Sequence, residues 1–243
     1  MRRCGMLLPV ASLPSRYGIG AFSKEAYEFI DYLKKAGQSY WQILPLGPTS
    51  YGDSPYQSFS TFAGNPYFIS LEDLIEEGVL TREECAQADP EVQEDSIDYA
   101  KLYEERYPLL RLAYERSDIS KNADFVRFCQ ENDWWLSDYA LFMAVKARFG
   151  GKAWTKWAQD IRLRWGNALD YYRRELYFDI EFHKYLQFTF FKQWSRLKAY
   201  ANRQGIRIIG DIPIYVAMDS ADAWANPSLF QLDENNRPLA VAG

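Results

Sequence analysis

The order of hydrophobic segments near the start of the chain is the feature that most constrains its fold. A short apolar run at residues 5–8 is closed by Pro9, and a second run occupies residues 40–44. Between them, Ser23 can cap a helix whose apolar side chains recur three and four residues apart, before Gly37 ends it. A strand, a helix and a strand joined by short links predict parallel strands in a right-handed βαβ unit.

The second strand leads directly into a segment rich in turn-forming residues. Residues 45–68 combine prolines, glycines and aromatic side chains without a helical or alternating period, which favours an ordered loop. A long ordered loop at the end of a strand is where a rigid scaffold usually carries binding groups. Flat aromatic faces beside hydroxyl, amide and carboxylate groups suit sugars. The structural alternative is an aromatic loop folded onto its own core.

The middle of the chain is almost wholly helical up to a third strand at residues 206–209. Thr81 and Glu84 have the spacing of a capping box. The helices are expected at 99–116, 123–130, 134–149 and 185–202. This run is too long for one crossover, so the predicted fold class is α/β with a large helical insertion between strands two and three. The predicted division is 1–70, 71–185 and 186–243, with the third strand in the last part.

Each predicted strand is followed by a loop with turn formers and polar or aromatic groups, at residues 12–20, 45–67 and 210–230. In (β/α) barrels such loops form the site at the carboxyl ends of the strands, so we expect the three loops to converge on one cleft. Asp211 follows the third strand directly. We interpret it as a ligand for a substrate hydroxyl, with capping of the turn as the alternative.

Composition excludes several classes of function. A net charge of -5, with no stretch that concentrates Lys and Arg, argues against a nucleic-acid surface. Cys4, Cys85 and Cys129 lie far apart without a CxxC motif, which fits reduced thiols. No segment approaches the roughly 18 apolar residues of a membrane span, and Pro9 and Ser12 interrupt any signal peptide. The expected location is cytoplasmic, without a membrane partner.

Side chains that could carry other chemistry are few. His183 is the only histidine and lies in a helical run, so a Ser-His-Asp triad or a histidine-based metal site is not expected. No glycine-rich phosphate loop follows a strand. Neutral polar substrates remain, and carbohydrates fit best. The tryptophans at 134, 135, 154 and 157 are interpreted as packing residues.

A set of motifs makes the chain recognisable. They are SLPS at 12–15, YGIG at 17–20, LPLGP at 44–48, YGDSPYQ at 51–57, AGNPY at 63–67, WWL to DYALF at 134–142, GDIPIYV at 210–216, F-x-LD at 230–233 and VAG at 241–243. In this order the chain resembles the 4-α-glucanotransferases, also called amylomaltases or disproportionating enzymes, of glycoside hydrolase family 77 in the α-amylase superfamily. The resemblance spans the whole chain.

The resemblance implies a fold and a reaction. The fold would be part of a TIM (β/α)8 barrel, its first three strands, in enzymes much longer than this chain. The reaction would transfer an α-1,4-glucan segment to the 4-hydroxyl of an acceptor sugar, without a cofactor or metal, by a retaining mechanism with two carboxyl groups. α-1,4-Glucans and maltooligosaccharides would be the partners. The alternatives are a non-catalytic α-glucan-binding protein and an α-amylase-type hydrolase.

The same resemblance assigns residues. The family's nucleophile lies in an Arg-x-Asp-His motif that does not occur here, so the nucleophile and the general acid are expected downstream of Gly243. No catalytic residue is therefore assigned, and the 243-residue chain alone is predicted to be inactive. Asp211 would accept hydrogen bonds from ring hydroxyls, and Tyr56 would stack on a sugar face. Tyr51 would contact glucan away from the cleavage point, and Asp53 would fix the turn of the loop. The other substrate-binding candidates are Ser54, Pro55, Gln57 and Pro213.

Overall fold

The computed structural model describes residues 2–49, 53–88 and 96–240. The chain divides into two compact units that alternate along the sequence. The first unit consists of residues 1–46, 64–122 and 186–212, and the second of residues 47–63, 123–185 and 213–243. The domain division expected from the sequence stays a prediction.

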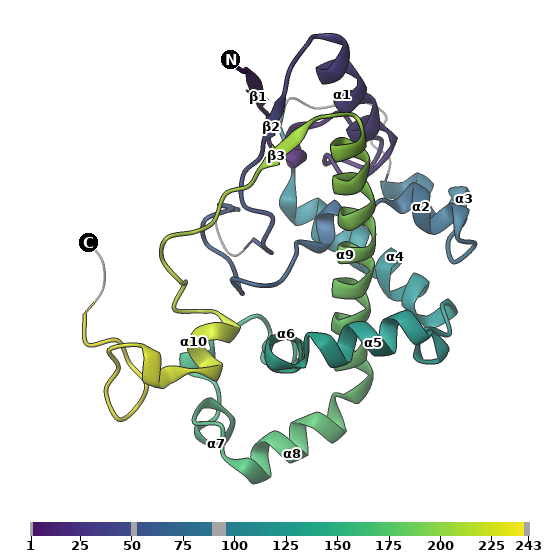
Figure 1. The fold of residues 1–243 in the computed structure, drawn as a ribbon. Helices are drawn as coiled ribbons and strands as arrows, with labels where there is room; N and C mark the ends of the chain where they lie inside the picture. The colour runs from purple at the N-terminus through teal and green to yellow at the C-terminus, as the bar shows by residue number, and fades with distance from the viewer. Residues whose placement is uncertain (1, 50–52, 89–95, 241–243) are drawn as a thin grey trace. The chain divides into compact units, whose positions relative to one another are not determined.

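The first unit contains a three-stranded sheet in the order β1-β2-β3, drawn in Figure 1. Its strands are β1 (Gly5–Leu7), β2 (Tyr40–Gln42) and β3 (Arg207–Ile209). Both pairs are parallel, with Tyr40 opposite Gly5 on one side and opposite Arg207 on the other. The predicted parallel order is therefore confirmed. Their carboxyl ends lie at one edge of the sheet, which is where the loops begin.

Helix α1 (Lys24–Lys35) connects β1 to β2 and packs against β2. Trp41 in the central strand is fully buried and meets Phe29 of α1 with ring centroids 5.2 Å apart. The outer strands are less covered, because Met6, Leu7 and Ile209 each expose more than two-fifths of their surface.

The helices between β2 and β3 form the predicted helical insertion. The first unit holds α2 (Leu71–Glu76), α3 (Arg82–Cys85) and α4 (Tyr99–Arg116), and the second holds α5 (Ala123–Glu131), α6 (Asp133–Arg148), α7 (Gln159–Arg162) and α8 (Gly166–Glu175). Short 3-10 turns lie at Val10–Ser12, Pro66–Phe68, Ala86–Ala88, Ile119–Lys121, Trp154–Lys156 and Pro227–Leu229. The capping box of Thr81 and Glu84 at α3 is confirmed.

Two helices differ from the sequence prediction. Helix α9 (Tyr177–Arg203) begins at Tyr177 rather than at Tyr185, and α10 (Ala221–Ala225) lies in a segment expected to be a loop. The hydroxyl of Ser220 accepts the backbone N–H of Ala223 and caps α10. Residues 177–185 of α9 belong to the second unit, and its remaining residues belong to the first.

The second unit has an aromatic core. Phe142 of α6 lies 5.3 Å from Trp157 and 5.9 Å from Trp224 of α10, measured between ring centroids. Trp154 and Trp135 are also buried, so their interpretation as packing residues is confirmed. That interpretation is wrong for Trp134, which exposes 67% of its surface. The difference follows from helical geometry, since adjacent residues of α6 point to different sides.

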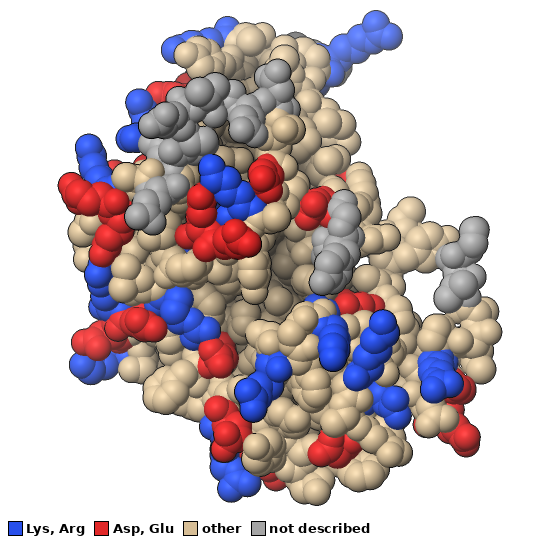
Figure 2. Space-filling view, turned by 180° about the vertical axis from the view of Figure 1, so that it is seen from behind, with Lys and Arg blue, Asp and Glu red and all other residues tan. Residues whose placement is uncertain are grey.

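On the face that Figure 2 shows, the described residues carry both signs of charge. Figure 2 shows acidic and basic side chains side by side over the visible face, in keeping with the small net charge of -5. In the described part of the chain, no helix has the length and apolar character needed to span a membrane.

Candidate functional site

Two buried glutamines of α9 hold the end of the long loop after β2. The Gln187 side chain accepts the N–H of Gly64 at 2.7 Å and donates to its carbonyl at 2.9 Å. Gln193 makes the same pair of hydrogen bonds to the backbone of Ser70, at 2.7 and 3.3 Å. Both glutamines are at most 1% exposed, so each amide satisfies two backbone groups that water cannot reach. The backbone from 64 to 70 is therefore fixed at both ends.

The loop is also closed at its base. The N–H of Asn65 donates to the carbonyl of Leu46 at 2.8 Å, which joins the two ends of residues 47–63. Gly64 is required there, because a Cβ atom at this position would lie 2.2 Å from the ring of Phe190. The loop therefore leaves and re-enters the first unit at a defined point.

Four of the predicted site residues form one turn at the tip of this loop. The carbonyl of Ser54 accepts the N–H of Gln57 at 3.1 Å, and its hydroxyl accepts the N–H of Tyr56 at 3.3 Å. Pro55 occupies the second position of the turn, where its fixed φ is favourable. Asp53 precedes the turn with φ of +56°, and its role in fixing the turn stays a prediction. The side chain of Tyr56 is 46% exposed, which leaves its ring accessible.

The stem of the loop is anchored within the second unit. The carbonyl of Phe59 accepts the N–H of Ala221 at 2.8 Å. One carboxylate oxygen of Asp222 accepts both the N–H of Thr61 at 2.7 Å and its hydroxyl at 3.0 Å. Burial raises the pKa of Asp222, while the bonds from Thr61 lower it. The segment that follows β3 thus holds the loop that follows β2.

A largely buried ion pair holds the same segment to α6. The Nζ of Lys146 lies 2.6 Å from Oδ2 of Asp219, with the lysine side chain only 6% exposed. The other oxygen of Asp219 accepts the N–H of Trp154 at 3.2 Å. The ammonium group also lies 4.9 Å from the ring centroid of Phe59, within range of a cation–π contact. Through Lys146, helix α6 therefore contacts both the segment after β3, at Asp219, and the loop after β2, at Phe59.

Two further predicted site residues, Asp211 and Pro213, are not part of the turn at residues 54–57. Asp211 follows β3 in the first unit and is half-buried, and its Oδ1 accepts the N–H of Ile212 at 2.9 Å. This bond matches the turn-capping alternative. A contact between Asp211 and a sugar hydroxyl stays a prediction. Pro213 belongs to the second unit and is half-buried. Convergence of the three loops on one cleft also stays a prediction.

Two motifs named in the sequence analysis lie partly or wholly outside the described residues. The residues concerned are 51 and 52, which include Tyr51, expected to contact glucan, and residues 241–243, which end at Gly243. The expectation that the nucleophile and the general acid lie downstream of Gly243 stays a prediction, because the structure describes the chain only as far as residue 240.

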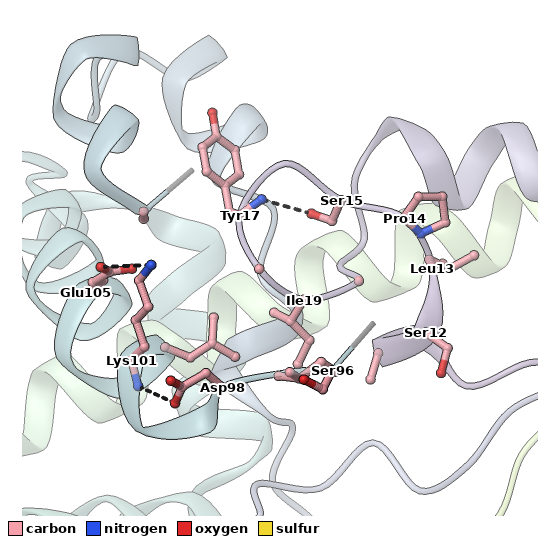
Figure 3. Close-up of a pocket in the computed structure, with 16 residues that line it drawn as sticks. Ser12, Leu13, Pro14, Ser15, Tyr17, Ile19, Ser96, Asp98, Lys101 and Glu105 are labelled. Atoms are coloured by element: carbon pink, nitrogen blue, oxygen red, sulfur yellow. Dashed lines mark hydrogen bonds and ion pairs between the residues drawn. The ribbon is translucent and has the colours of Figure 1, made fainter. Parts of the chain in front are cut away.

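The loop after β1 lines a cavity of about 500 Å³ within the first unit (Figure 3). Residues 11–20 form one side and residues 96–105 the other. Lys101 lies 3.9 Å from Glu105, and Oδ1 of Asp98 accepts the N–H of Lys101 at 3.0 Å. Asp98 bonds the backbone of Lys101 and not its ammonium group, so this side of the cavity carries two carboxylates and one ammonium group. No feature of residues 96–105 had indicated a cavity.

Arg106 holds the loop after β1 by a hydrogen bond to its backbone. Its guanidinium donates to the carbonyl of Tyr17 at 3.4 Å and to the carbonyl of Ile69. The side chain is 1% exposed, and burial lowers the pKa of Arg106 to about 10. The residue remains charged at neutral pH, and the negative charge of Glu72 and the two backbone carbonyls compensate its buried charge.

Two of the three cysteines, Cys85 and Cys129, carry thiols that burial makes unreactive. Within the described chain all three are free thiols, as expected. Burial raises the pKa of Cys85 and of Cys129 to about 11. Both are therefore protonated at neutral pH and weak nucleophiles.

A family model and several known proteins match this chain. A family model described as 4-alpha-glucanotransferase matches residues 8–242. A 4-alpha-glucanotransferase from Clostridium butyricum is 48% identical over 96% of this chain and 48% of its own length, and one from Thermus thermophilus is 48% identical over 100% of this chain and 48% of its own. The chain thus spans about half the length of the curated relatives it matches.

Solved structures agree. An amylomaltase from Streptococcus agalactiae, solved in complex with acarbose, is 44% identical with a TM-score of 0.96, and the match covers 100% of this chain and 50% of that one. An amylomaltase from Corynebacterium glutamicum, at 24% identity and a TM-score of 0.73, matches over 93% of this chain and 32% of its own and supports the fold alone. On the family match and these identities, the chain belongs to the 4-α-glucanotransferase family.

Proposed function

We propose that this chain is part of an enzyme that transfers α-1,4-glucan segments between maltooligosaccharides or starch-like glucans by a retaining mechanism. The family match over residues 8–242 carries this proposal. We also infer that β1, β2 and β3 are the first three strands of a (β/α)8 barrel and that the protein is cytoplasmic. Support for the barrel comes from the parallel sheet, in which each strand leads to a loop at the same edge.

The chain would supply part of a donor site. The turn at residues 54–57 presents the half-exposed ring of Tyr56, which can stack on the face of a sugar. Asp211 would accept hydrogen bonds from ring hydroxyls, and Ser54 and Pro55 would shape the wall. Gln57 and Pro213 are further substrate-binding candidates. The Arg-x-Asp-His motif is absent from this sequence, so the nucleophile of the retaining mechanism would come from outside residues 1–243.

Ligand binding by the 243-residue chain tests the donor site. The relative from S. agalactiae was solved with acarbose, so acarbose and maltoheptaose are suitable probes. Each should raise the melting temperature of the chain, because a ligand that binds the folded state stabilises it. Tyr56→Ala and Asp211→Asn should reduce the shift, whereas Tyr32→Ala, at an exposed position on α1, should leave it unchanged. Equal shifts in all variants would contradict the assigned residues.

Activity tests the reaction. The 243-residue chain should release no glucose from maltotriose. A protein in which the same chain is completed by the second half of the family's length should produce glucose and longer maltooligosaccharides together. Reducing-sugar release from starch without longer products would instead favour a hydrolase. Transfer by the 243-residue chain itself would refute the assignment of the nucleophile.

A further inference from the structure

Two exposed aromatic side chains from distant parts of the second unit meet at its surface. Phe62 is 45% exposed and Trp134 is 67% exposed. Their ring centroids are 4.6 Å apart with an angle of 73° between the planes, so the rings meet edge to face. An edge-to-face contact leaves much of each ring uncovered, and two such rings exposed together need an explanation.

Both rings stand on a fixed backbone. The hydroxyl of Ser60 accepts the N–H of Phe62 at 3.1 Å and that of Ala63 at 3.3 Å, and Ser60 is 2% exposed. On the other side, the carbonyl of Asn132 accepts the backbone N–H of Trp135 at 3.1 Å and that of Leu136 at 2.9 Å, at the start of α6. The aromatic pair is therefore held in place before any ligand arrives, which lowers the entropy cost of binding.

Hydrogen-bonding groups lie beside the rings on α6. Ser137 is three residues from Trp134, so the two side chains share one side of the helix. The hydroxyl of Ser137 donates to Oδ1 of Asp133, which is exposed. The carboxylate of Asp133 retains a second oxygen that can accept bonds from hydroxyl groups. Aromatic faces with a carboxylate and a hydroxyl at the rim are what a neutral sugar ring requires.

The size of the surface decides between a glucan and a protein partner. With about 150–250 Å² for a whole aromatic side chain, the exposed fractions leave roughly 250 Å² on the two rings together. A stable protein interface covers about 800 Å² on each partner. The area suits one or two sugar rings. Phe62 also belongs to the same loop, residues 47–63, as Tyr56.

We propose that Phe62 and Trp134, with Asp133 and Ser137, form a second contact site for α-glucan chains, separate from the donor-site turn at residues 54–57. This proposal rests on the proposed function, because it takes its ligand class from it. A glucose unit would lie against the aromatic pair, and its hydroxyls would bond the carboxylate of Asp133. The site would hold a long glucan while its end is processed elsewhere.

A nuclear magnetic resonance titration of the 243-residue chain tests this site directly. Maltoheptaose is added to the ¹⁵N-labelled chain while the indole N–H signals are followed, and Trp134→Phe identifies the signal of Trp134. That signal should move, whereas the signal of buried Trp41, whose indole N–H donates to Leu8 at 2.8 Å, should not. If glucan shifts other signals but leaves that of Trp134 in place, the proposal is overturned.

Variants add a second readout. Trp134→Ala and Phe62→Ala should each weaken maltoheptaose binding about tenfold, the change expected from losing one good aromatic contact. The matched control is Phe178→Ala, which removes an aromatic side chain that is 75% exposed in the same unit. Its ring contacts only its sequence neighbour Tyr177 among the aromatic contacts of the described chain, so affinity should not change. Circular dichroism confirms that each variant is folded.

The outcomes separate this site from the donor site. Unchanged affinity in Trp134→Ala, with weakened binding in Tyr56→Ala, would refute the aromatic site and leave the proposed function standing. No binding of any glucan by the wild-type chain would remove the basis of both. A Trp134 signal that moves with protein concentration and not with glucan would indicate contact between two copies of the chain and overturn the proposal.

Discussion

The ion pair between Lys146 and Asp219 allows a quantitative prediction. Its lysine side chain is 6% exposed and its aspartate side chain 29%, so removing one partner leaves a charge that water reaches poorly. Breaking a buried pair in this way costs about 3–5 kcal/mol. Because Asp219 is partly exposed, and Lys146 keeps a contact with the carbonyl of Lys152 at 3.4 Å, we expect Asp219→Ala to lower the free energy of unfolding by about 2–4 kcal/mol.

Urea unfolding followed by tryptophan fluorescence measures this free energy. The double variant Lys146→Met with Asp219→Leu should recover at least half of the loss, because it removes both charges from the buried site. The control is Lys24→Met, which removes a pair to Glu28 with side chains 79% and 49% exposed. It should change stability by less than about 0.5 kcal/mol.

Two results would refute this reasoning. A loss in Asp219→Ala no larger than that of Lys24→Met would mean that the buried pair contributes nothing. A double variant as unstable as the sum of its two single variants would mean that the charges do not depend on one another. Either result would leave the segment after β3 without its assigned attachment to α6.

Two further predictions concern single positions elsewhere in the chain. Gly64→Ala should lower the free energy of unfolding by about 1–3 kcal/mol in the same urea titration. The new methyl group would overlap the ring of Phe190, which lies 2.2 Å from the Cβ position. The control is Gly166→Ala, which has no described atom within 4 Å of its Cβ position and should be neutral or slightly stabilising. Hydrogen bonding from Arg116 lowers the pKa of Glu84 below 4.5 in the folded chain, so this carboxylate stabilises the fold above that pH and loses its effect as the pH falls. Melting temperatures should therefore show Glu84→Gln below wild type at pH 7, and the gap should narrow as the pH falls through the lowered pKa of Glu84. A gap that does not narrow in acid would contradict the assigned cause.

The sequence predicted the parallel sheet well because its strands and the helix between them have strong local signals. Turn residues indicated the position of the loop after β2 for the same reason, whereas the turn at residues 54–57 became visible only in the structure. Helix α10 was missed because Ser220 and the short apolar run after it resemble the surrounding loop. The early start of α9 was missed because Tyr177 and Phe178 are exposed and break the apolar period.

The supports of the loops could not be read from the sequence. Gln187 and Gln193 lie among many polar residues of α9, and only the fold shows that their amides bond the backbone more than a hundred residues away. Lys146 and Asp219 pair over a separation of 73 residues for the same reason. Trp134 and Trp135 are identical in type and adjacent, so only tertiary packing distinguishes the exposed ring from the buried one.

The backbone hydrogen bonds of Gln187 and Gln193 in α9 set the length of the segment between Gly64 and Ser70. Six residues of helix separate Gln187 from Gln193, an advance of about 9 Å. Six residues also separate Gly64 from Ser70, and as an extended chain they would span about 20 Å. The 3-10 turn at Pro66–Phe68 shortens this segment enough to match. One inserted or deleted residue between 64 and 70 would therefore break the pair of backbone hydrogen bonds made by Gln187 or by Gln193.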